Sequence, residues 1–135
     1  MRLLARMRLF AKYPAGCTLA TVVALAALVV AAPSFAARNP RPGERAAISR
    51  AVKHSRLTSA VPDYEYTVRG IRVSTKGPFA KGETFGVGRY KDVVQPALVL
   101  LKKSKGRWRL IDIGGDLSCH DAPHAVFRDL RLHCA

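Results

Sequence analysis

Acidic residues are scarce in this sequence, whose 135 residues include 9 Asp and Glu against 23 Lys and Arg and carry a formal net charge of +14. Aromatic residues are also few, at 7% of the chain, whereas apolar residues reach 49%, a balance that excludes both a disordered chain and a wholly membrane-embedded one. The sequence has no heptad pattern and no repeat of about 20–50 residues, which excludes coiled coils and solenoids. Its length suits one domain, so we expect a small, basic, globular protein.

The motifs of the common enzyme classes are missing as well. No Gly-x-Ser-x-Gly elbow and no Ser-x-x-Lys motif is present, and the glycines between residues 77 and 88 match no nucleotide-binding spacing. Asp112 and Asp116 flank a strand end, but a two-carboxylate hydrolase needs converging acids, and we expect each to pair with an arginine. These absences favour a non-enzymatic protein without a cofactor or a bound metal ion.

Residues 1–36 have the layout of a secretory signal peptide. Four cations precede an uncharged run over residues 17–32, Pro33 breaks any helix, and small residues at Ser34 and Ala36 suit a cleavage site after Ala36. An uncleaved anchor is the alternative, although the run is shorter than the ~20 apolar residues of a spanning helix. Cleavage would leave 19 Lys and Arg against 9 Asp and Glu, a net charge of +10. We expect a secreted, extracellular or cell-envelope protein with no transmembrane anchor after cleavage.

Two cysteines remain after residue 36, Cys119 and Cys134. In an oxidising compartment two such cysteines usually pair, and the chain-entropy model gives a loop of this length a stabilisation of ~3 kcal/mol. The alternative is a pair of metal-binding thiolates. We expect a disulfide that ties the end of the chain to residues 114–119.

The order of hydrophobic patterns predicts an α+β fold over residues 44–135, in which an N-terminal helix packs on a curved antiparallel sheet of three to four strands and a short C-terminal helix is pinned by the disulfide. Gly70 marks a change of alternation phase that predicts a β-bulge, and Trp108 is expected in the core. Asp121 is expected to cap the last helix. The predicted segments are a flexible basic leader (37–43), helices (44–58 and 121–131), strands (64–75, 79–85, 93–101 and 107–113) and a turn (102–106).

Two stretches carry a family resemblance. Residues 106–110 (GRWRL) resemble the Gly-x-Trp-x-Leu hairpin of cystatin-like and NTF2-like α+β domains. The tail is similar to small secreted disulfide-bonded α+β proteins of unassigned function from high-GC Gram-positive bacteria, where a strand ends in Gly and a Cys-Pro-Leu-Cys series follows. Its residues here are Gly114, Cys119, Pro123, Val126, Leu130, Leu132 and Cys134. The resemblance implies a fold and an export route, and no particular activity.

Residues 119–124 (CHDAPH) are the first candidate site. His120 and His124 have a spacing that zinc sites use on a helix, and with Asp121 they offer groups for acid–base chemistry. His120 precedes the predicted helix, however, Asp121 has a capping role, and Cys119 is expected in the disulfide. The structural role is therefore favoured over a catalytic one.

The second candidate is a basic hairpin tip, formed by Lys102, Lys103, Lys105, Arg107 and Arg109. Cations beside Trp108 are typical of polyanion binding with aromatic stacking. The alternative is a solvated strand end that discourages edge-to-edge pairing.

Three functions follow as hypotheses. The first is an exported binding module whose basic surface contacts an anionic cell-wall polymer, a membrane surface or a secreted protein, without specific nucleic-acid recognition. The second is a small hydrolase or metal enzyme that uses His120, Asp121 and His124. The third, by fold analogy, is an inhibitor or partner of a secreted enzyme.

Overall fold

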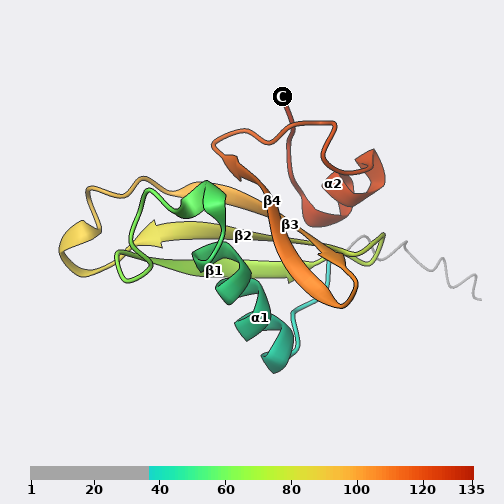
Figure 1. Ribbon diagram of the computed structural model, residues 1–135. Coiled ribbons are helices and arrows are strands. Elements are labelled where there is room, and N and C mark those ends of the chain that lie inside the picture. Colours follow the sequence, from blue (N-terminus) through green and yellow to red (C-terminus); the bar gives the residue numbers. More distant parts are fainter. Residues whose placement is uncertain (1–36) are drawn as a thin grey trace, which may run out of the picture. The chain divides into compact units, whose positions relative to one another are not determined.

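The computed structural model describes residues 37–135, and the predicted signal peptide lies outside the described residues. Helix α1 (Pro42–Lys53) lies on one face of an open antiparallel sheet and the short helix α2 (His124–Leu130) lies on the other (Figure 1). Each strand pairs with its neighbour in the chain, in the order β1 (Tyr66–Val73), β2 (Phe79–Gly86), β3 (Ala97–Ser104) and β4 (Arg107–Gly114). The predicted α+β fold is therefore confirmed, with four strands in the sheet.

The face under α1 holds the larger of two cores. Ile48 and Val52, one helical turn apart, are completely buried, and they pack against side chains that alternate along the strands. Trp108 belongs to this core with 9% of its surface exposed, as predicted. The other strand residues of this core are Tyr66, Ile71, Val73, Ala80, Val99, Leu101 and Leu110.

The face under α2 holds the second core. Val126, Phe127 and Leu130 pack with Phe79 and Leu100, whose side chains point away from α1. Because each face of β3 meets a different helix, residues 98–101 of this strand are all apolar. No helix within residues 37–135 combines the length and apolar character needed to cross a membrane.

The bulge predicted at Gly70 is confirmed. The pairing of β1 with β2 shifts between Arg69 and Arg72, and Gly70 has a φ of +61°, which a residue with a side chain rarely adopts. Arg69 and Arg72 consequently lie on the same face of the sheet, although they are an odd number of residues apart.

The turn of the last hairpin is shorter than the predicted 102–106. Lys105 and Gly106 alone form it, with φ angles of 49° and 76°, which is typical of the two-residue turns that match strand twist. Lys102 and Lys103 instead pair with Arg109 and Trp108 inside the sheet. The sequence could not locate this boundary because lysines occur in both turns and strand ends.

Residues 37–43 are not a flexible leader, contrary to the prediction. Arg38 exchanges backbone hydrogen bonds of 2.8 and 2.9 Å with Val73, and Ala37 is buried. The guanidinium of Arg38 also forms a two-pronged ion pair with Glu44, at 2.7 and 2.8 Å. Pro42 is the first residue of α1, where its missing N–H costs nothing, so the helix begins before residue 44.

The bounds of both helices differ from the predicted ones. α1 ends at Lys53, and a separate 3₁₀ turn η1 (Arg56–Thr58) follows it; a second one, η2 (Gly88–Tyr90), precedes β3. α2 begins at His124 and not at residue 121, with Pro123 as its N-cap residue. Residue 122 precedes Pro123, and a residue before a proline disfavours helical backbone angles. The helix therefore begins only after Pro123, which leaves Asp121 too far from its first turn to cap it.

Asp129 attaches α2 to the chain that leaves β1. It is 2% exposed, and it accepts hydrogen bonds from the Ser74 hydroxyl at 2.7 Å and the Thr75 N–H at 2.6 Å. Burial alone would raise the pKa of Asp129, but the hydrogen bonds from Ser74 and Thr75 and the nearby Lys76 charge hold it below its ordinary value.

Replacement of this carboxylate tests its structural role. Asp129→Ala leaves the buried donors of Ser74 and Thr75 without an acceptor, and we expect a loss of about 2–4 kcal/mol in the free energy of unfolding at neutral pH. Because the pKa is lowered in the folded state, this difference should shrink as the pH falls through that pKa. Urea denaturation at pH 7 and pH 3 measures both effects, with the exposed Asp63→Ala as control. Equal stability of the two variants at pH 7 would contradict the assignment.

Candidate functional site

Four of the five cations of the predicted hairpin tip are divided between the two faces of the sheet, and the fifth, Lys105, lies in the turn. Lys103 lies on the α1 face, with its Nζ 5.6 Å from the ring centroid of Trp108. Lys102 lies on the α2 face, with its Nζ 5.6 Å from the ring centroid of Phe79. Stacking of a ligand on Trp108, the alternative to the expected core position, is therefore disfavoured, because the ring is buried and a lysine lies over it.

Lys102 and Arg109 form a like-charged pair on the α2 face. They are direct partners in the pairing of β3 with β4, and both are exposed. Arg107 lies on the same face because it is two residues from Arg109 in the same strand. Like charges placed directly opposite in a sheet repel one another, so an anion bound between them would relieve a cost built into the strand pair.

A second like-charged pair lies on the same face at the other side of the sheet. Arg72 and Lys81 are direct partners in the pairing of β1 with β2. With Arg131, just past the end of α2, they line a depression of about 280 Å³. Asp129 also lines it, but its carboxylate is engaged by Ser74 and Thr75.

The charges of this second cluster are poorly compensated. Burial lowers the pKa of Lys81, and the charges of Arg72 and Arg131 lower it further, against the opposing effect of Glu83. The hydrogen-bond acceptors of the Arg72 guanidinium are two uncharged oxygens, from the Ala37 carbonyl and the Asn39 side chain. Among the described residues the one ion pair is Arg38 with Glu44, so these cations are available to a ligand.

Sequence reasoning missed Arg72, Lys81 and Arg131. The alternation within the predicted strand indicated that Arg72 lies on the sheet face opposite to its apolar neighbours. Its face could therefore have been predicted. The register of β1 against β2, however, depends on the bulge and turn geometry. Arg131 reaches the cluster only through the fold of the C-terminal segment.

The structure brings together the two candidate sites that the sequence suggested separately. His120, Asp121 and His124 line an open depression of about 700 Å³ together with Lys102. Both histidines are exposed. Within residues 37–135 no three His, Cys, Asp or Glu side chains are grouped so as to hold a metal ion. The depression therefore places two imidazoles beside Lys102.

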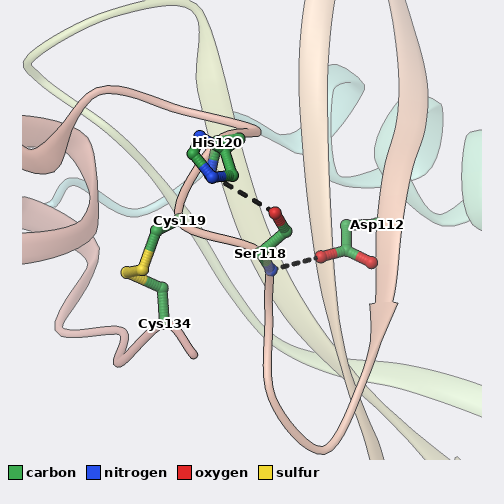
Figure 2. Close-up of a disulfide and its surroundings, with 5 residues drawn as sticks. All are labelled: Asp112, Ser118, Cys119, His120 and Cys134. Atoms are coloured by element: carbon green, nitrogen blue, oxygen red, sulfur yellow. Dashed lines mark hydrogen bonds between the residues drawn. A yellow bond between two sulfur atoms is a disulfide. The ribbon is translucent and has the colours of Figure 1, made fainter.

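A disulfide between Cys119 and Cys134 closes the C-terminal segment, as predicted (Figure 2). The two Cα atoms are 4.9 Å apart across a sequence separation of 15. Leu117 forms an isolated parallel bridge with Cys134, and the Ala135 N–H donates to the Leu117 carbonyl at 3.0 Å. The Cys119 sulfur is therefore unavailable as a nucleophile or a metal ligand.

The loop before the disulfide is held by Asp112. Its carboxylate accepts the backbone N–H groups of Ile113 and Ser118, both at 2.8 Å, and the Ser118 hydroxyl accepts the His120 N–H at 3.3 Å (Figure 2). This corrects the expectation that Asp112 pairs with an arginine. Burial, and then the neighbouring Asp112 side chain, raise the pKa of Asp121, although the charge of His120 lowers it.

Comparison with known proteins gives no relative, because no protein-family model, curated protein or solved structure matches this chain. The resemblance to small secreted proteins and to cystatin-like hairpins accordingly stays a prediction.

Removal of the Asp121 charge tests whether burial and the nearby Asp112 carboxyl group raise the pKa of Asp121. A raised pKa in the folded state means that the ionised group costs stability at neutral pH, and that this cost disappears below its pKa. We expect Asp121→Asn to raise the free energy of unfolding at pH 7 by up to about 1 kcal/mol, with no gain at pH 3. The exposed Asp116→Asn, which changes the net charge equally, is the control in urea denaturation. A loss of stability in Asp121→Asn at pH 7 would contradict this account.

Proposed function

We propose that this protein is an exported, non-enzymatic binding module that holds an anionic cell-envelope polymer against the α2 face of its sheet. The observation that carries the proposal is that two pairs of like-charged strand partners lie on this one face. The pairs are Lys102 with Arg109 and Arg72 with Lys81. A fold that places cations opposite one another accepts repulsion in the unbound state. A bound anion would attract both cations of a pair and offset their mutual repulsion.

The position of the two pairs favours a polymer over a single small anion. Lys81 and Lys102 lie on adjacent strands, two residues apart in register, because Lys81 is the partner of Leu100. Packing against α2 buries Leu100 and Phe79 beside these lysines. A chain with repeated negative charges can contact both cationic pairs and pass by the C-terminal segment. Such binding depends strongly on salt, because it releases counterions.

Export is part of the proposal. The disulfide is consistent with an oxidising compartment outside the cytosol. The arrangement of charged, apolar and small residues in positions 1–36 supports a signal peptide that is cleaved after Ala36.

No observation on the described residues favours the alternative hydrolase or metal enzyme over a binding module. An inhibitor of a secreted enzyme is a second candidate only by fold analogy. The resemblance to exported proteins of high-GC Gram-positive bacteria agrees with a cell-envelope role and adds no ligand.

Binding to inorganic polyphosphate, as a simple anionic polymer, tests the surface. We expect Lys102→Gln/Arg109→Gln to weaken binding roughly tenfold at moderate salt and to reduce the slope of log affinity against log salt by about two, one for each lost phosphate contact. The matched control is Arg45→Gln/Arg50→Gln, which removes two exposed charges from α1. Fluorescence anisotropy over a salt series gives both quantities. Equal losses in the two variants would show that net charge, and not this face, governs binding.

Intact mass spectrometry of secreted material tests export. The expected mass begins at Ala37 and lies below the fully reduced value by the mass of one hydrogen molecule. A retained N-terminus would contradict cleavage, and free thiols would contradict the disulfide.

A further inference from the structure

An apolar pocket lies on the α1 face of the sheet, at the end away from the last hairpin turn. It has a volume of about 360 Å³ and is walled by the segments that follow α1 and precede β3. Strand residues Tyr66, Thr84 and Ile113 form part of its lining. Leu57 and Val93, also in the lining, are 53% and 73% exposed, so large apolar side chains stand at an opening to solvent.

The Tyr66 hydroxyl is the unusual group of this pocket. Tyr66 is only 3% exposed, and its buried hydroxyl has no hydrogen-bond partner among the described residues. The two other hydroxyls of the lining are occupied: Thr58 donates to the Val52 carbonyl and Thr84 to the Ala97 carbonyl. Buried polar groups in folded proteins nearly always have a partner, so the unpaired hydroxyl of a residue that lines the pocket marks a position where a ligand atom would be favoured.

The charge of the lining limits the ligand. Glu65 is the one charged residue that lines the pocket, in a described chain with 19 Lys and Arg. An anion would meet a carboxylate in the lining, in contrast to the α2 face. Lys53, whose Nζ is 5.9 Å from the Tyr66 ring centroid, is not a lining residue and donates to the Asp63 carbonyl. The rest of the lining is mainly apolar, and its volume falls within the range of small-molecule sites.

We propose that this pocket binds a small, uncharged, largely apolar molecule through one oxygen, which accepts a hydrogen bond from the Tyr66 hydroxyl. The apolar body of the ligand contacts Val61, Val94 and Ile113. This site is independent of the polyanion surface, because it lies on the other face of the sheet and uses none of its cations.

Acetophenone and its hydrocarbon analogue cumene test the hydrogen bond, because they differ by an oxygen in place of a methyl group. In ¹⁵N–¹H NMR titrations of the chain from residue 37, we expect both to shift the amides that line the pocket, with acetophenone binding about three- to tenfold more tightly. Tyr66→Phe should abolish that preference and leave cumene binding unchanged. Tyr64→Phe, which removes an exposed hydroxyl outside the lining, is the matched control and should behave as the wild type.

Two outcomes would overturn the proposal. One is the absence of shifts at the lining residues with either compound; the other is an equal affinity of the wild type for both, which would mean that Tyr66 contacts no ligand oxygen. Tyr66→Phe removes only a buried oxygen without a partner, so its thermal midpoint should equal or exceed that of the wild type. If the variant failed to fold, intermolecular NOEs between acetophenone and the Ile113 methyl groups of the wild type would decide the matter by their presence or absence.

Discussion

The closure of residues 117–135 onto the sheet is the constraint on which the α2 face depends. The Cys119–Cys134 bond and the Leu117–Cys134 bridge fix the two ends of this segment, and the apolar side chains of α2 fill the space against Phe79 and Leu100. The cross-link contributes ~3 kcal/mol in the chain-entropy model. Without this closure, a large part of the second core would be exposed, and the 119–124 loop would not lie beside Lys102.

One small domain thus presents two chemically different surfaces, of which the closure shapes the one on the α2 face. On the α2 face, the C-terminal segment covers the apolar centre and leaves cationic strand pairs beside it. On the α1 face, the helix packs on the sheet, and the apolar pocket lined by Tyr66 lies at an end of the sheet that the helix does not line. We propose that charge governs recognition on the first face, and that burial with a single hydrogen bond governs it on the second.

Much of the fold could be predicted from local signals. The bulge at Gly70, the buried Trp108 and the disulfide each follow from residue types and spacing. The start of α2 could not be predicted, because it depends on where Pro123 falls relative to the helix. The backbone hydrogen bonds between Arg38 and Val73 could not be predicted either, because they join segments that are distant in sequence. The residues of the proposed binding surface also differ in how far they could be predicted. Lys102 and Arg109 form a cluster that is local in sequence, whereas Arg72, Lys81 and Arg131 come together only through strand register and tertiary packing.

We propose that anions bind at the α2 face and not over the whole basic surface. The most direct measurement is a ¹⁵N–¹H NMR titration of the oxidised protein with inorganic polyphosphate at moderate salt. If anions bind at this face, the largest amide shifts are expected at Lys81, Lys102, Arg109 and Arg131, with α1 unaffected. Shifts spread evenly over the chain, or concentrated on α1, would contradict it.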